Sequence, residues 1–219
     1  MVYDIAKEET WRVFRIMSEF VDGFEDLSQV GPAVSIFGSS RVKSSNAHYK
    51  KAEKLARLLV KEGYAVITGA GPGVMEAANK GASEAGGKSI GLNIQLPNVQ
   101  KPNRYVNIML DFRYFFCRRV MFVKYAEAYV MLPGGYGTLD EFFEIITLIQ
   151  TQKIEPVPVV LLGETYWNTF LKWAKETLLA EDFVEAKDLK IFKIVDTPEE
   201  VIQIVRKLPK QRNASRRKK

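Results

Sequence analysis

The feature that most constrains the fold is a regular alternation of short apolar runs with longer segments of helical periodicity, which begins after residue 32. The runs expected to be strands are 33–37, 65–68, 89–94, 106–110, 128–132, 157–162 and 192–195. The helices expected between them include 47–62, 112–126, 138–150, 167–179 and 198–207. Such alternation is typical of a parallel sheet covered by helices on both faces. We therefore expect an α/β fold, a Rossmann-like open parallel sheet, without internal repeats.

The first 30 residues predict an additional helix that is amphipathic. Apolar side chains recur there at three- and four-residue spacing, at Val13, Phe14, Met17, Phe20, Val21 and Phe24. Such a stripe needs a cover, which we expect to be the body of the protein or a second subunit. The expected organisation is an N-terminal helix in residues 1–30, one domain in residues 31–207 and a basic flexible tail in residues 208–219.

The charge of the chain is concentrated in that tail. The formal net charge is +6, and eight basic residues with no acidic one lie between Arg206 and Lys219, which leaves −2 for the rest. A basic terminus could contact nucleic acid or an anionic membrane, but a solubilising tail is the simpler interpretation. We expect no nucleic-acid or membrane partner for the body. The absence of a signal-peptide pattern or a long apolar segment predicts a cytoplasmic protein.

The chain contains few residues that could bind a metal ion or form a catalytic triad. The chain has one cysteine, Cys117, and one histidine, His48, far apart in the sequence. A zinc site or a nucleophile–histidine pair would have to include this pair, and no supporting ligand spacing surrounds either residue. The sequence therefore predicts no metal site and no disulfide framework.

Three glycine-rich loops follow predicted strands: residues 38–40, 69–73 and 133–138. Glycine lets the backbone approach a phosphate, and the free amides of the following helix favour an anion. One such loop can be merely a tight turn, but three at the same edge of a parallel sheet predict an anionic ligand. The residues expected to bind it here include Gly38, Ser39, Gly71 and Gly73.

Two common nucleotide motifs do not fit these loops. Counted from Gly69, the third glycine of a G-x-G-x-x-G fingerprint would be residue 74, which is Val74, and the next strand ends without an acid for a ribose. The chain also has no G-x-x-x-x-G-K-[ST] sequence. We therefore expect neither a bound dinucleotide nor P-loop chemistry, and no resident cofactor.

The third loop carries the most specific signal. Residues 133–141 have the sequence PGGYGTLDE, which places a phosphate loop, then a hydroxyl, then the carboxylate of Glu141 in the first turn of a helix. Upstream, Arg118 and Arg119 are expected late in the preceding helix, where a guanidinium group could bind a phosphate or a carboxylate, or form a surface ion pair.

This combination resembles the LONELY GUY (LOG) family of nucleoside 5′-monophosphate phosphoribohydrolases, whose members often carry the label "possible lysine decarboxylase". The motif PGG-x-GT-x-x-E, the upstream Arg118-Arg119 pair and residues 69–76 carry the resemblance, which extends from about residue 32 to residue 205. The longer N-terminal helix and residues 112–116 are similar to the bacterial long form. The resemblance implies a Rossmann-like nucleotide-binding catalytic domain, a nucleoside monophosphate as small-molecule partner, and a homodimer or higher homo-oligomer.

The resemblance also assigns residues to roles. It implies that Arg118 and Glu141 are catalytic. It implies substrate or phosphate contacts at Arg119, Gly134, Gly135, Tyr136, Gly137, Thr138, Leu139, Asp140 and Thr147. The chain departs from the family in having arginine rather than lysine at 119, and in lacking an acid in residues 94–104, where Gln95, Asn98 and Asn103 are the polar substitutes.

The activity implied is hydrolysis of the N-glycosidic bond of a cytokinin riboside 5′-monophosphate or AMP, giving free base and ribose 5-phosphate. The alternative from another class is a carrier of the same fold that binds a nucleotide or molybdenum cofactor without turnover. A lysine decarboxylase is rejected, because that reaction uses pyridoxal phosphate on a lysine and the motif loops contain no lysine.

Overall fold

The computed structural model describes residues 5–96 and 101–208, with side chains from Trp11 onward. Its centre is a seven-stranded parallel sheet in the order β4-β3-β2-β1-β5-β6-β7. The strands are β1 (Ala33–Phe37), β2 (Ala65–Thr68), β3 (Ser89–Ile94), β4 (Ile108–Phe112), β5 (Ala128–Met131), β6 (Val159–Leu162) and β7 (Phe192–Val195). The predicted α/β fold with an open parallel sheet is confirmed.

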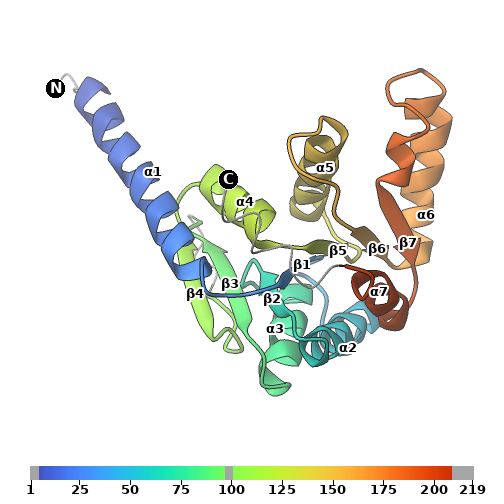
Figure 1. Cartoon of the computed structure of the whole chain (residues 1–219), viewed down its shortest axis with the longest axis horizontal. Coiled ribbons are helices and arrows are strands. Elements are labelled where there is room, and N and C mark those ends of the chain that lie inside the picture. Colours follow the sequence, from blue (N-terminus) through green and yellow to red (C-terminus); the bar gives the residue numbers. More distant parts are fainter. Residues whose placement is uncertain (1–4, 97–100, 209–219) are drawn as a thin grey trace.

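Helices cover both faces of the sheet (Figure 1). The α-helices are α1 (Ile5–Leu27), α2 (Ala47–Lys61), α3 (Val74–Glu84), α4 (Phe115–Tyr125), α5 (Tyr136–Gln150), α6 (Glu164–Trp173) and α7 (Pro198–Val205). A π-helical turn, η1 (Ala174–Leu179), continues α6, and a short 3-10 helix, η2 (Asp188–Lys190), precedes β7. Figure 1 shows α1, α4, α5 and α6 on one side of the sheet and α2, α3 and α7 on the other.

Alternation along the strands divides the core into two layers. In β1, Val34 and Ile36 belong to the apolar cluster that includes α2, α3 and α7, whereas Ala33 and Phe37 belong to the cluster that includes α4 and α5. All five residues of β1 are buried, as expected for a central parallel strand. Strand β1 is thus buried on both faces, and it lies between β2 and β5, the two strands that carry the other glycine loops.

Several element boundaries differ from the sequence-based expectation. β4 covers Ile108–Phe112 rather than 106–110, because it pairs with β3 in the register Ile90↔Ile108 to Ile94↔Phe112. α4 consequently begins at Phe115, and α5 begins at Tyr136, two residues earlier than expected. The helix expected at 167–179 is α6 followed by the π-helical turn.

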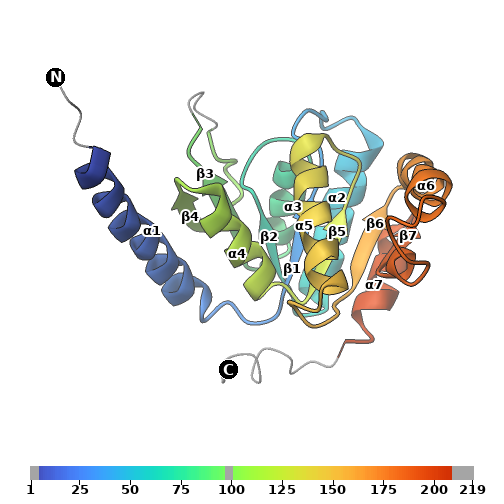
Figure 2. The same ribbon diagram turned by 90° about the horizontal axis from the view of Figure 1, so that it is seen from above.

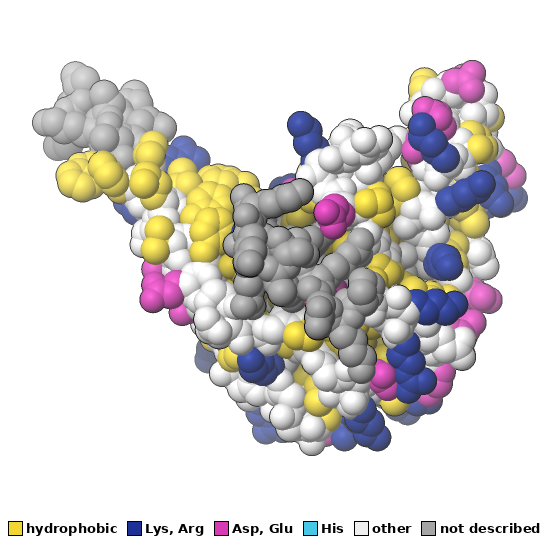
Figure 3. All heavy atoms as spheres, in the orientation of Figure 1, with side chains coloured by type: hydrophobic (Ala, Val, Ile, Leu, Met, Phe, Trp, Pro, Cys, Tyr) yellow, Lys and Arg dark blue, Asp and Glu magenta, His cyan; other side chains and the backbone are white. Residues whose placement is uncertain are grey.

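Helix α1 lies against α4 and projects away from the body (Figure 2). Phe20 packs against the core, but Val13, Phe14, Met17 and Val21 are each more than half exposed. Of the two covers expected for the stripe, the body therefore supplies only a part, and Figure 3 shows hydrophobic side chains gathered along this helix. None of the described helices is long and apolar enough to cross a membrane. The predicted tail, apart from Leu208, lies outside the described residues.

Candidate functional site

The three glycine loops converge at the carboxyl ends of β1, β2 and β5. Strand β1 lies between the other two, so the strand order reverses at this point, which is the usual ligand site of an open parallel sheet. Ser39 joins the loops: its amide donates to the Pro133 carbonyl at 3.1 Å, and its carbonyl accepts from the Val74 amide at 3.0 Å. The loops therefore form one connected backbone surface.

Three of the loop glycines are needed because the loops pack closely against one another and against the helices that follow them. Gly73 has a φ of +70°, and a Cβ there would overlap the Ser39 carbonyl oxygen. A Cβ on Gly38 would lie 2.7 Å from Val74 Cγ1, and one on Gly134 would lie 2.7 Å from Thr138 Cβ. Real Cβ atoms do not approach other atoms so closely, so these positions need glycine even without a ligand.

A buried polar network holds the second loop. The Thr68 hydroxyl donates to Asn79 Oδ1 at 2.6 Å, and the Ala70 amide donates to the Thr68 hydroxyl at 3.0 Å. The Asn103 side-chain amide donates to the carbonyl oxygens of Ala70 and Gly71, at 3.0 and 3.1 Å. These bonds keep Ala70 in the left-handed region, with a φ of +62°, which costs free energy for a residue other than glycine.

A cavity of about 750 Å³ opens where the loops meet. Ten of the predicted site residues line it: Gly38, Ser39, Arg118, Gly134, Gly135, Tyr136, Gly137, Thr138, Leu139 and Glu141. The remaining wall is mostly apolar and is formed by Phe37, Met75, Ile94, Leu96, Phe115 and Phe122, together with Ser40, Arg41 and Gly69. The cavity therefore combines glycine backbone and two arginines with an apolar surface.

Arg118 and Glu141 form a buried pair in this cavity. Arg118 Nη2 lies 3.7 Å from Glu141 Oε1, and the two side chains are 13% and 4% exposed. Burial raises the pKa of Glu141 to about 7, although the Arg118 charge opposes this. Burial also lowers the pKa of Arg118 below its usual range. Among the described residues, Glu141 Oε2 and Arg118 Nε have no hydrogen-bond partner, so both groups have capacity for a ligand.

The two residues of the pair come from different helices. Arg118 is the fourth residue of α4, and the expectation that it lies late in a helix is wrong, because α4 begins at Phe115. Its guanidinium carbon lies 5.1 and 5.6 Å from the ring centroids of Phe115 and Phe122. Glu141 is the sixth residue of α5, so it lies in the second turn rather than the first. Together α4 and α5 bring the charges together across the cavity.

Five predicted binding residues do not line the cavity: Gly71, Gly73, Arg119, Asp140 and Thr147. Arg119 instead lies 3.5 Å from Asp140 and 3.7 Å from Glu144, on the adjacent surface of α4 and α5. Thr147 is exposed two turns further along α5. Since α5 has 3.6 residues per turn, Asp140 and Thr147 lie on a different face from Glu141.

The residues proposed as polar substitutes for the missing acid do not reach the cavity either. Asn103 is engaged in the network around the second loop, and Gln95 is exposed outside the lining. Asn98 lies outside the described residues. The apolar wall and Arg41 also line the cavity, and neither was among the residues expected from the sequence. The position of Arg41 directly after the first loop could have predicted that it lies at the site. Met75, Phe115 and Phe122 could not be predicted in this way, because their sequence context is that of ordinary core residues.

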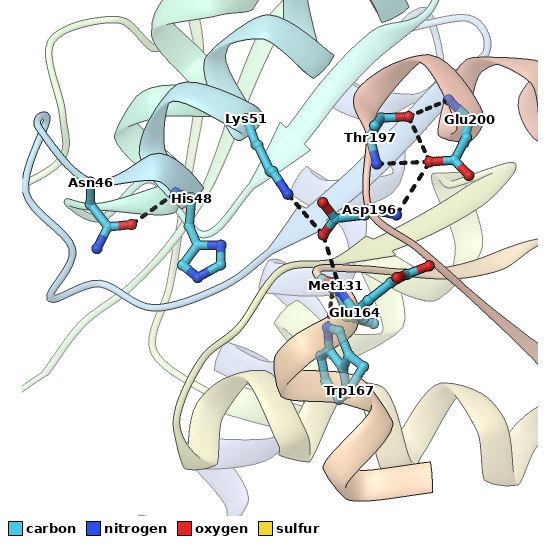
Figure 4. A network of polar contacts seen from close by, with 9 residues as sticks. All are labelled: Asn46, His48, Lys51, Met131, Glu164, Trp167, Asp196, Thr197 and Glu200. Atoms are coloured by element: carbon cyan, nitrogen blue, oxygen red, sulfur yellow. Dashed lines mark hydrogen bonds and ion pairs between the residues drawn. The ribbon is translucent and has the colours of Figure 1, made fainter.

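A second polar network lies beside the site, at the ends of β6 and β7 (Figure 4). Lys51 Nζ lies 2.9 Å from Asp196 Oδ1, which also accepts from the Glu164 amide at 3.3 Å. The Trp167 indole donates to the Met131 carbonyl at 3.1 Å, at the end of β5. These contacts anchor the starts of α2 and α6 next to the third loop.

The lone histidine and cysteine stay apart from the cavity. His48 lies at the start of α2 in Figure 4, and Cys117 is buried in α4, where burial raises its pKa to about 11. Neither lines the cavity. No cluster of histidine, cysteine and acidic residues with the makings of a metal site occurs among residues 5–96 and 101–208.

Comparison with known proteins identifies the family. The family model described as "Possible lysine decarboxylase" matches residues 75–205. Cytokinin riboside 5′-monophosphate phosphoribohydrolase LOG3 of Arabidopsis thaliana is 28% identical over 175 residues, which cover 76% of this chain and 77% of that protein.

Solved structures share the fold. An X-ray structure from the Northeast Structural Genomics Consortium is 26% identical, with a TM-score of 0.60, and covers 81% of this chain and 99% of that chain. The molybdenum cofactor binding protein from the phototrophic bacterium Rippkaea orientalis is also 26% identical, with a TM-score of 0.57, and covers 80% of this chain and 94% of that chain. With a family model that matches more than half of its residues and relatives named as LOG phosphoribohydrolases, this chain belongs to the LOG family.

Proposed function

We propose that this protein hydrolyses the N-glycosidic bond of a nucleoside 5′-monophosphate, such as AMP or a cytokinin riboside 5′-monophosphate, to the free base and ribose 5-phosphate. The observation that carries the proposal is the buried Arg118–Glu141 pair, which faces the same cavity as the third glycine loop. The named activity of the LOG relatives supports it.

Cleavage of an N-glycoside places positive charge on the ribose as the base departs. The carboxylate of Glu141 stabilises this charge and accepts a proton from the attacking water. The water oxygen then forms the new bond to C1′ as the bond from C1′ to the base nitrogen breaks with its electron pair on the base. Arg118 orients Glu141 and donates a hydrogen bond to the departing base, which takes up a proton from solvent.

The 5′-phosphate binds at the start of α5. The helix begins at Tyr136 and its N-cap, Gly135, has no side-chain cap. The Thr138 and Leu139 amides donate to the Gly135 carbonyl, which leaves the amides of Tyr136 and Gly137 for an anion. Binding the phosphate away from the scissile bond positions the ribose against Glu141. Arg41, on the first loop, adds positive charge to the same cavity.

The family label of lysine decarboxylase does not fit the site. A pyridoxal phosphate enzyme needs a lysine for its Schiff base, and none of the described lining residues is a lysine. Lys88 and Lys124, which are not far from the motif loops in the sequence, are engaged elsewhere: Lys88 donates to the backbone carbonyls of Gln29 and Val30, and Lys124 lies over the rings of Phe24 and Tyr125.

The test is an assay of the purified protein with AMP and isopentenyl-AMP, in which free base and ribose 5-phosphate are followed by chromatography. We expect release of both products in equal amounts, and the ratio of the two rates indicates which base the apolar wall prefers. Failure to release base from these or other nucleoside monophosphates would contradict the proposal.

The reaction should depend on pH through Glu141. Its pKa of about 7 means that the carboxyl group is mostly protonated below this pH and cannot then accept a proton from water. We expect kcat to increase about tenfold with each unit by which the pH is raised, up to about pH 7, and to stay constant above that pH. A pH–rate profile between pH 5 and 9 measures this, and a rising limb near pH 4.5 would show that the ionisation of Glu141 does not control the rate.

The second candidate is a carrier without turnover. It is favoured by the similarity to the molybdenum cofactor binding protein, which shares the fold at 26% identity, against 28% for the LOG3 relative. Binding of AMP or of molybdenum cofactor without base release would support this candidate. Retention of Glu141 beside Arg118 in the cavity favours the enzyme.

We also propose that the protein is a homodimer, as the family resemblance implies. The exposed apolar residues Val13, Phe14, Met17 and Val21 on α1 support a partner surface, since such residues seldom stay in water as a group. Light scattering of the full chain measures the assembly, and a monomer at micromolar concentration would contradict it.

A further inference from the structure

Helix α4 begins without a cap of its own. Its N-cap residue, Tyr114, makes no side-chain cap hydrogen bond, and its first turn contains no acidic residue. The first backbone amides of a helix need acceptors, and a carboxylate is the acceptor that the helix dipole favours most. The carboxylate at this helix start comes from another element of the chain, and it binds the two backbone amides just before the helix.

That acceptor is Glu19 of α1. Its Oε1 accepts from the Arg113 amide at 2.8 Å, and its Oε2 accepts from the Tyr114 amide at 3.3 Å. Both carboxylate oxygens are thus bound to the residues that lead into α4. Burial is the main cause of the raised pKa of Cys117, and the charge of Glu19 is the second cause. The carboxylate therefore lies close to the first turn of α4.

Other contacts hold α1 along the length of α4. A Cβ on Gly23 would lie 2.7 Å from Met121 Cε, so the helices approach closely at the middle of α4. At the far end, the Tyr125 hydroxyl donates to the Phe24 carbonyl at 3.2 Å. Glu19 is therefore not an isolated contact but part of a continuous interface between α1 and the region of α4.

The start of α4 connects directly to the active-site arginine. The Arg118 amide donates to the Tyr114 carbonyl at 3.3 Å, which makes Tyr114 and Arg118 the two ends of the first helical turn. The Arg118 guanidinium then reaches Glu141 at 3.7 Å. Because this separation is already longer than a hydrogen bond, a small displacement of the first turn changes how strongly the two charges interact.

From these contacts we infer that Glu19 is a positioning residue: by holding the start of α4, it keeps the Arg118 guanidinium beside Glu141. The N-terminal helix is then part of the catalytic apparatus, although it contributes no residue to the cavity lining. The inference rests on the proposed function only for the roles of Arg118 and Glu141.

The first test is Glu19→Gln, which keeps the size of the side chain but removes its charge. We expect kcat for AMP to fall about tenfold with the dissociation constant for AMP unchanged, since the phosphate site on α5 is untouched. Glu25→Gln is the matched control, because it makes the same change at an exposed position of the same helix. Loss of AMP binding together with kcat would contradict a positioning role.

The decisive measurement is the ionisation of Glu141, followed by carboxyl-carbon NMR in the full-length protein. The charged groups that face Glu141 are Arg118 and Arg119 from α4, and Asp140 and Glu144 from α5. Displacement of Arg118 removes a charge that lowers the pKa of Glu141, so we expect Glu19→Gln to raise this pKa by about half a unit to one unit.

An Arg118→Ala background separates positioning from general destabilisation. If Glu19 acts through Arg118, Glu19→Gln should not change the pKa of Glu141 any further once Arg118 is absent. An unchanged pKa in the single variant, or an equal shift in both backgrounds, would overturn the inference. This titration does not depend on turnover, so a failure of the proposed function leaves it intact as a test.

Discussion

Replacing Glu141 with glutamine should abolish base release while AMP still binds. We expect kcat to fall by about 10³-fold, because the amide cannot take a proton from water or stabilise positive charge on the ribose. The affinity for AMP should stay within about threefold, since the proposed phosphate site lies at the start of α5 and glutamine keeps the shape of the side chain. Product chromatography and calorimetric titration with AMP measure the two quantities.

The matched control is Glu155→Gln, which removes the same charge from an exposed position after α5. Its turnover should equal that of the unchanged protein. Turnover of Glu141→Gln close to that of the unchanged protein would remove Glu141 from the mechanism, whatever the substrate. Joint loss of turnover and binding would instead assign Glu141 to ligand binding.

Replacing Gly134 with alanine should have the second largest effect. A Cβ there would lie 2.7 Å from Thr138 Cβ and 3.1 Å from the Ser39 amide nitrogen, and Thr138 is nearly fully buried. Rotation of the Thr138 side chain cannot relieve a contact with its Cβ, so the backbone of the third loop has to move. This movement weakens the hydrogen bond from Ser39 to Pro133 that joins the first and third loops.

We expect Gly134→Ala to lower the affinity for AMP by about 10²-fold and the free energy of unfolding by about 1–3 kcal/mol. Thermal unfolding and calorimetric titration measure these changes. The control is Gly137→Ala: an added Cβ there meets nothing within 4 Å, and alanine is favourable in a helix, so stability should not fall. Equal stability and affinity of both variants would show that the loops are not packed as described.

The order of strands and helices could be predicted because it depends on local patterns. β5 and β6, for example, are uninterrupted apolar runs that are buried at every residue, and such runs are recognisable without any contact information. The convergence of the three glycine loops follows from the same order, since the carboxyl ends of parallel strands lie at one edge of the sheet. Ten of the residues expected at the site accordingly line the cavity.

Some predicted site residues do not line the cavity, because the direction of a side chain depends on the exact residue at which its helix starts. The shift of β4 by two residues moved the start of α4 to Phe115 and placed Arg118 early in that helix. One residue further along, Arg119 points to the acids of α5 instead of into the cavity. Successive helical residues differ by about 100° in direction, so sequence adjacency does not keep two arginines in one site.

The sequence by itself determined the fold class, the edge of the sheet that carries the site and the motif that includes Glu141, because apolar periodicity and glycine spacing are local properties. Only the tertiary structure decided that Glu141 is buried beside Arg118 with a pKa of about 7, that the rest of the cavity wall is mostly apolar and that Glu19 binds the backbone amides that lead into α4. The physical reason is that desolvation and charge pairing depend on atoms brought together from distant parts of the chain, here α1, α4 and α5, and no local pattern encodes their distances.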